Sequence, residues 1–137
     1  ERLRLETVER FFRSRREELR LLYLSRALEA APRDPYLNYL LGRRLQQVGD
    51  PRLGVEHTSR ALTAGGLELP EALRREALST LVEGAYLAGD CGAVRHEVGA
   101  LPDFGPAFKA GATEWKARCD FEDAVFQGPL VPRQAFR

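Results

Sequence analysis

The sequence contains no methionine and no isoleucine, and its single asparagine is Asn38. Of its 21 Lys and Arg residues, only Lys109 and Lys116 are lysines. Because the arginines are spread along the chain, this bias indicates a GC-rich bacterial genome more than selection for arginine as a reader of phosphates or carboxylates. The missing initiator methionine predicts a fragment or a processed chain, with further domains in the parent protein.

Long apolar runs and a strong excess of charge are also missing. No stretch approaches the roughly 18 to 20 apolar residues of a membrane span, and no signal peptide is recognisable. The formal net charge of +1 provides no overall field toward nucleic acid or membrane. We therefore expect a single domain without membrane insertion, and the bacterial cytoplasm and the periplasm both remain open as compartments.

Enzyme motifs are equally scarce. There is no glycine-rich phosphate loop, no nucleophile elbow and no pair of histidines at metal-ligand spacing, and we expect His57 and His96 at the surface or at the edge of a groove. Glu76 and Glu83 lie seven residues apart, on one helical face, where paired carboxylates could perform acid/base chemistry. Since no nucleophile or oriented base accompanies them, a carboxylate-based enzyme is the weakest interpretation, and we expect no cofactor and no metal.

A regulatory or nucleic-acid-associated helical domain is the stronger alternative. Its densest basic cluster would be Arg13, Arg15 and Arg16, but Glu17 and Glu18 follow directly and offset that charge. Nucleic acid is therefore a less favoured partner than protein.

Three dipeptides recur between apolar helical stretches: Gly49-Asp50, Gly89-Asp90 and Cys119-Asp120. The steps of 40 and 30 residues between them bracket the period of about 34 residues that is typical of helix-turn-helix arrays. Each dipeptide predicts a turn between two helices. The predicted fold class is all-α, built from stacked antiparallel helix hairpins.

The clearest unit covers residues 34–64. Asp34 is a good N-cap and Pro35 suits the first helical position, where no amide hydrogen is needed. Gly42 lies inside the predicted helix, where glycine costs about 1 kcal/mol relative to alanine, so it indicates close approach of a neighbouring helix. Gly49 fits the left-handed residue that ends the helix, and Asp50 restarts the next one.

This unit resembles the tetratricopeptide repeat (TPR) family, through Leu41-Gly42, Leu45, Gly49-Asp50, Gly54 and Ala61. Asn38 departs from the pattern, since an aromatic residue is usual there. The resemblance implies a TPR-like α-solenoid of three to four helical units within one domain over residues 1–127. The weaker units are 1–32, 70–101 and 106–127, and 128–137 is expected to be a flexible tail.

In stacked hairpins of this kind, the first helices line a concave groove that binds a partner peptide or protein surface. That register predicts a groove of Tyr36, Tyr39, Arg43, Gln46, Glu76, Ser79, Glu83, Tyr86, Lys109, Thr113 and Lys116. Packing between helices is the alternative role for Tyr36 and Tyr39. Family members that hold chaperone tails clamp a terminal carboxylate with Lys and Asn, a set that Arg43 alone does not reproduce. Family analogy alone suggests a non-enzymatic scaffold in a bacterial assembly or a secretion or export complex.

Cys91 and Cys119 fall at the corners of adjacent predicted units. A disulfide between them is conceivable, and it would indicate an oxidising compartment such as the periplasm. Two free thiols are the alternative, because helix spacing alone does not bring the two alpha carbons within bonding range.

An apolar stripe marks the N-terminal segment, which is expected to be helical. Its residues are Leu3, Leu5, Val8, Phe11, Phe12, Leu19, Leu22 and Tyr23. The stripe is expected to cap the stack, and a homodimer through this helix is the alternative.

Overall fold

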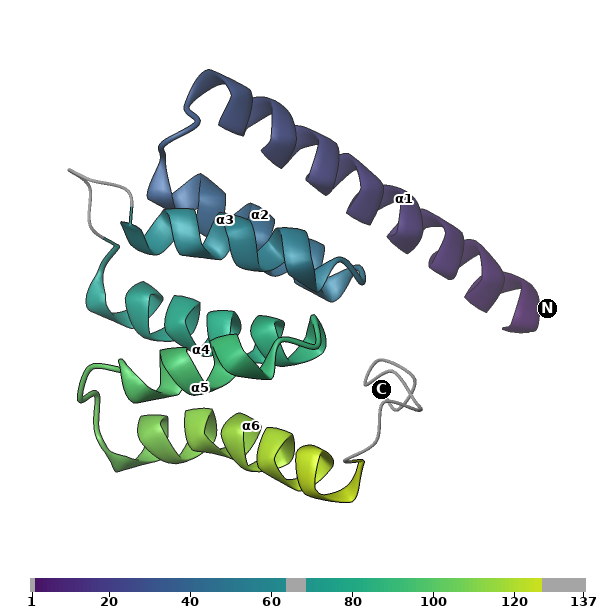
Figure 1. Ribbon diagram of the computed structural model, residues 1–137. Coiled ribbons are helices and arrows are strands. Elements are labelled where there is room, and N and C mark those ends of the chain that lie inside the picture. The colour runs from purple at the N-terminus through teal and green to yellow at the C-terminus, as the bar shows by residue number, and fades with distance from the viewer. Residues whose placement is uncertain (1, 64–68, 127–137) are drawn as a thin grey trace.

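Six helices account for the regular structure of the computed structural model, which describes residues 2–63 and 69–126. They are α1 (Arg2–Ala30), α2 (Pro35–Gln47), α3 (Pro51–Thr63), α4 (Glu71–Leu87), α5 (Cys91–Gly99) and α6 (Pro106–Val125). The described residues contain no strand, which confirms the all-α prediction. Figure 1 shows the helices layered in chain order from α1 to α6. The predicted flexible tail, 128–137, lies outside the described residues.

The hairpin of α2 and α3 begins and ends where the sequence predicts. The Asp34 carboxylate accepts a hydrogen bond from the Leu37 amide at 3.0 Å, and Asp50 accepts one from the Leu53 amide at 3.3 Å. Gly49 has a φ of 98°, a left-handed conformation that costs glycine little. These local signals place the two helices antiparallel with a short turn between them.

Backbone contact between α2 and α3 explains the glycine inside α2. A Cβ added to Gly42 would lie 2.5 Å from Thr58 Oγ1 and 2.8 Å from the Gly54 carbonyl oxygen. A Cβ added to Gly54 would lie 2.7 Å from the Gly42 carbonyl oxygen. The prediction of close helix approach at Gly42 is therefore confirmed.

Asn38 replaces the expected aromatic residue with a buried polar junction. Its amide nitrogen donates to the carbonyl oxygens of Pro32 and Asp34, at 3.1 and 2.9 Å. Its Oδ1 lies 3.0 Å from His57 Nδ1, which must carry the shared proton because Oδ1 can only accept. The expectation that His57 lies at the surface is wrong, since this bond holds it in the interior, whereas His96 is exposed as expected.

The turn between α4 and α5 repeats the first one. Gly89 has a φ of 81°, and the Asp90 carboxylate accepts a hydrogen bond from the Ala93 amide at 3.0 Å. Helix α5 is only nine residues long. It packs Val94 into a core cluster with Val82 and Tyr86 of α4.

The third dipeptide does not form a turn. Helix α6 runs without interruption through Cys119-Asp120, so the predicted unit 106–127 is one helix and not a hairpin. The turns at Gly49 and Gly89 use a positive φ, which no residue other than glycine adopts in the described part of the chain. Cys119 lacks that freedom, and its buried side chain faces α5.

Helix α1 is a single helix that packs against α2 near its C-terminal end, where Leu28 is buried. An ion pair between Glu17 and Arg44 adds a second attachment. Figure 1 shows α1 diverging from the stack toward its N-terminus. The described part of the apolar stripe is largely exposed, with Leu19 63% and Tyr23 75% exposed, so this face does not cap the stack as expected. Self-association through it stays a prediction.

We expect Gly42→Ala to lower the free energy of unfolding by about 1 to 3 kcal/mol, because the new methyl group overlaps Thr58 and the Gly54 backbone. Gly111→Ala is the matched control within α6, where nothing lies within 4 Å of the added Cβ. It should raise stability by about 0.5 to 1 kcal/mol through helix propensity. Urea unfolding followed by circular dichroism measures both, and equal effects of the two variants would contradict the close crossing.

Stability should also fall in mild acid because of His57. Burial and the nearby Arg60 lower its pKa in the folded chain, although Glu56 opposes them. The unfolded chain therefore binds a proton near pH 6.5, whereas the folded chain binds it only at a lower pH. The contribution of His57 to the free energy of unfolding is fully present above that pH. It is lost as the pH falls toward the folded pKa, by at most about 1.4 kcal/mol per pH unit. Urea unfolding at several pH values measures this, and the free energy of unfolding should depend less steeply on pH in His57→Gln than in the original chain.

Candidate functional site

One open groove of about 700 Å³ lies between α2, α4 and the start of α6. It is called the groove below. Its lining comes from three segments that are separated in sequence by α3 and α5, and it mixes charged, polar and aromatic side chains. The lining residues are Tyr39, Arg43, Gln46, Gln47, Arg75, Glu76, Ser79, Thr80, Glu83, Leu87, Phe104, Ala107 and Phe108.

Tyr39 anchors the α2 wall to the core. Its side chain is only 1% exposed and packs with Ala61, Leu69 and Ala77. Its hydroxyl donates to Glu76 Oε2 at 3.0 Å, which ties α2 to α4. Burial raises the pKa of Tyr39, and the bond and charge of Glu76 raise it further, while Arg43 opposes both. Tyr39 therefore stays a neutral donor, and only its hydroxyl end belongs to the groove.

An aromatic pair forms the end of the groove next to α6. The rings of Phe104 and Phe108 meet edge to face, with centroids 5.2 Å apart. The guanidinium of Arg75 lies 5.3 Å from the Phe104 ring centroid, and that of Arg74 lies 5.7 Å from it. Sequence reasoning missed this pair, although Gly105-Pro106 between the two rings marks the start of a helix.

Two opposite charges face the groove without an ion pair. Arg43 projects from α2 and Glu83 from α4, and neither forms a salt bridge among the described residues. Glu83 is half-buried and Arg43 is exposed. Hydroxyl and amide groups of neighbouring lining residues add donors and acceptors between the two charges.

Six of the predicted groove residues line the groove, and five lie away from it. Those that line it are Tyr39, Arg43, Gln46, Glu76, Ser79 and Glu83. Tyr36 is exposed on α2, outside the lining. Tyr86 is buried, since its ring packs 5.1 Å from Trp115 and its hydroxyl donates to Glu122. Tyr39 and Tyr86 thus pack between helices, whereas Tyr36 does not.

The predicted groove residues of α6 also point elsewhere. The Thr113 hydroxyl donates to the Lys109 carbonyl oxygen at 2.6 Å, within α6 itself. Lys116 pairs with Asp120 at 3.7 Å, one turn along the helix. Only the first turn of α6 reaches the groove, through Ala107 and Phe108. The predicted register is therefore wrong beyond that turn, because α6 turns a different face to α4.

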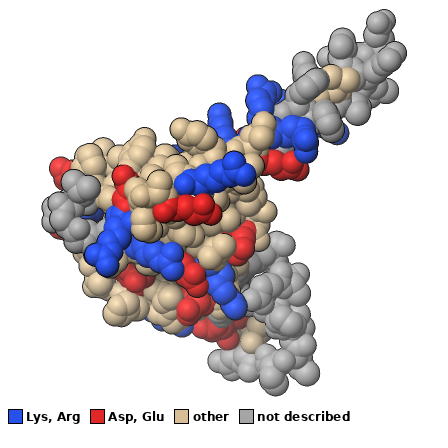
Figure 2. Space-filling model, turned by 90° about the horizontal axis from the view of Figure 1, so that it is seen from above, with Lys and Arg blue, Asp and Glu red and all other residues tan. Residues whose placement is uncertain are grey.

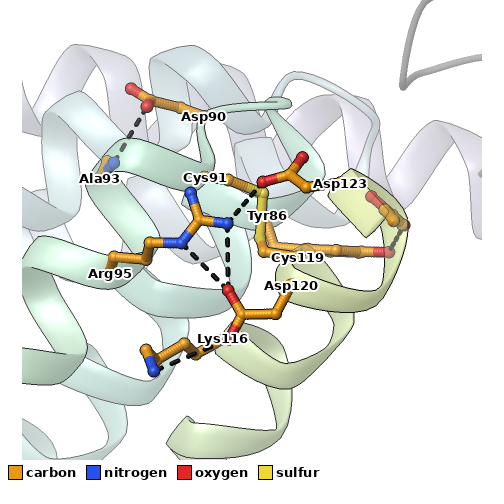
Figure 3. Close-up of a disulfide and its surroundings, with 10 residues drawn as sticks. Tyr86, Asp90, Cys91, Ala93, Arg95, Lys116, Cys119, Asp120 and Asp123 are labelled. Atoms are coloured by element: carbon orange, nitrogen blue, oxygen red, sulfur yellow. Dashed lines mark hydrogen bonds and ion pairs between the residues drawn. A yellow bond between two sulfur atoms is a disulfide. The ribbon is translucent and has the colours of Figure 1, made fainter. Parts of the chain in front are cut away.

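A disulfide attaches α6 to the rest of the stack. Cys91, the first residue of α5, is bonded to Cys119 of α6, with alpha carbons 5.8 Å apart (Figure 3). Beside it, the Arg95 guanidinium lies 3.1 Å from Asp120 and 2.5 Å from Asp123. Of the two alternatives for the cysteines, the structure contains the disulfide. It holds the helix that supplies one wall of the groove.

Other site types find no support in the described residues. No group of three or more His, Cys, Asp or Glu side chains there could hold a metal ion. Within residues 2–63 and 69–126, no helix combines the length and the apolar character needed to cross a bilayer. No protein-family model, curated protein or solved structure matches this chain.

Reducing the disulfide should lower the free energy of unfolding by about 3 kcal/mol, because the bond closes a loop of 28 residues in the unfolded chain. Urea unfolding with and without a dithiol reductant measures the effect. The double variant Cys91→Ala with Cys119→Ala should resemble the reduced protein and should not respond to reductant. An unchanged midpoint on reduction of the original chain would contradict this expectation.

Proposed function

We propose that this chain is a TPR-like protein-interaction module that binds a segment of a partner protein in the groove. The observation that carries the proposal is the lining of the groove. Three segments that are distant in sequence supply both signs of charge, polar groups and a half-buried pair of aromatic rings. Tyrosine, arginine and phenylalanine are all enriched at protein interfaces.

The order of helix contacts supports a stacked-hairpin arrangement. In such an array, the first helix of each hairpin contacts its own second helix and the first helix of the next hairpin. Here α2 contacts α3 and α4, and α4 contacts α5 and α6. The second helices α3 and α5 also pack on the helices that follow them. The groove would then be the concave face of an array whose first helices are α2, α4 and α6.

Charge pairing favours a protein partner over nucleic acid. Arg44 pairs with Glu17, Arg118 with Glu114, and Arg95 with two aspartates, so part of the basic charge is already paired with acidic side chains. Figure 2 shows acidic and basic side chains interspersed on one face of the molecule. A log-log dependence of binding on salt steeper than about −3 would favour the nucleic-acid alternative, since it requires several phosphates to be neutralised.

Glu76 and Glu83 both line the groove, and the carboxylate-based enzyme remains the weakest alternative. Glu76 accepts the Tyr39 hydroxyl at 3.0 Å, an arrangement that braces two helices and needs no chemistry. The parent protein would use the module as a scaffold in a bacterial assembly or export complex, a setting that rests on family analogy. The disulfide would suit an oxidising compartment such as the periplasm.

Binding should depend on Arg43. Peptides selected from a random displayed library on the immobilised domain provide the ligand, and fluorescence anisotropy measures their affinity. We expect Arg43→Ala to weaken binding about tenfold, because a groove cation that pairs with the ligand is worth roughly 1 to 2 kcal/mol. The Tyr39→Ala change is avoided because it would empty a core position.

The matched control is Arg52→Ala, which removes an exposed arginine from α3, outside the groove. It should leave the affinity unchanged within about twofold. Equal weakening by both variants, or by neither, would contradict binding in the groove.

A further inference from the structure

The charges of the groove define the chemistry of its ligand. Of the four charged side chains that line the groove, two already have partners. Glu76 accepts a hydrogen bond from the Tyr39 hydroxyl. Arg75 Nη2 lies 3.8 Å from Glu71 Oε1, and its guanidinium lies over the Phe104 ring. Arg43 and Glu83 differ, because neither forms an ion pair in the described part of the chain. These two side chains are available to charges that a ligand brings.

Their places along the helices set the order of the ligand's charges. The bond between Tyr39 and Glu76 marks one level at which α2 and α4 meet. Arg43 lies four residues beyond Tyr39, or about 6 Å along α2, and Glu83 lies seven residues beyond Glu76, or about 10 Å along α4. Figure 1 shows α2 and α4 running in the same direction, so the two charges are offset by about 4 to 5 Å along the groove.

The aromatic pair lies at the opposite end from Glu83. Arg75, which precedes Glu76 directly, stacks on Phe104, so the rings lie near the start of α4. An extended peptide advances about 3.3 Å per residue. A segment laid along the groove would therefore meet the aromatic pair first, then Arg43, and Glu83 one or two residues later.

We propose that the groove binds an extended segment that carries an apolar, an acidic and a basic side chain in that order along the groove. The apolar side chain packs on Phe104 and Phe108, the acidic one pairs with Arg43, and the basic one pairs with Glu83. Such pairs are strengthened in a partly desolvated groove, where the effective dielectric constant is lower than in water. This inference rests on the proposed function and specifies the ligand of the same site.

A charge-swap experiment tests the order. Peptides selected from a random displayed library on the original domain should be enriched in a basic residue one or two positions from an acidic one. We expect Glu83→Lys to weaken such a peptide at least about tenfold. Replacing the peptide's basic residue by glutamate should restore binding to Glu83→Lys and weaken binding to the original domain. Glu29→Lys, which changes an exposed residue of α1, is the control and should have no effect.

The outcomes separate this inference from the proposed function. The charge order would be overturned, and groove binding left intact, by peptides that bind Arg43→Ala more weakly but bind Glu83→Lys as tightly as the original domain. The same conclusion would follow if replacing the peptide's basic residue by glutamate did not restore binding to Glu83→Lys. Failure to select any peptide sensitive to Arg43→Ala would contradict both. Circular dichroism checks that Glu83→Lys is folded. If it is not, Glu83→Gln is used, and the same peptide should bind it several-fold more weakly.

Discussion

The backbone contact between α2 and α3 is the constraint on which the groove depends. With glycine at positions 42 and 54, the two helices approach until a single added carbon would overlap the neighbouring backbone. This approach fixes the rotation of α2, which places the Tyr39 ring in the core and its hydroxyl against Glu76 of α4. The position of the α2 wall relative to the α4 wall therefore depends on the contact that α2 makes with α3.

The last helix is held by different means. Helix α5 has only nine residues, and α6 packs on both α5 and α4, where the Trp115 ring meets Tyr86. The disulfide between Cys91 and Cys119 and the pairing of Arg95 with two aspartates supplement that packing. Helix α6 and the segment before it supply Phe104, Ala107 and Phe108 to the aromatic end of the groove.

The groove combines fixed and available groups. Tyr39 and Glu76 are engaged with each other and connect two walls, whereas Arg43 and Glu83 keep charges that no described residue neutralises as an ion pair. Exposed charges in water gain little from pairing, but a groove that excludes part of the water increases that gain. Such a surface suits a ligand whose own charges alternate, and it disfavours a polyanion.

The sequence by itself determined the hairpin of α2 and α3 and two of the turns, because Asp34, Asp50, Gly49 and Gly89 act on their own backbone and need no distant partner. It also placed half of the groove, since residues of α2 and α4 follow a regular helical register. The tertiary structure alone decided the burial of His57, the continuity of α6 through Cys119 and the aromatic pair at the groove. Each of these depends on contacts between segments far apart in the chain, and a local pattern carries no information about the side chains that such contacts bring together.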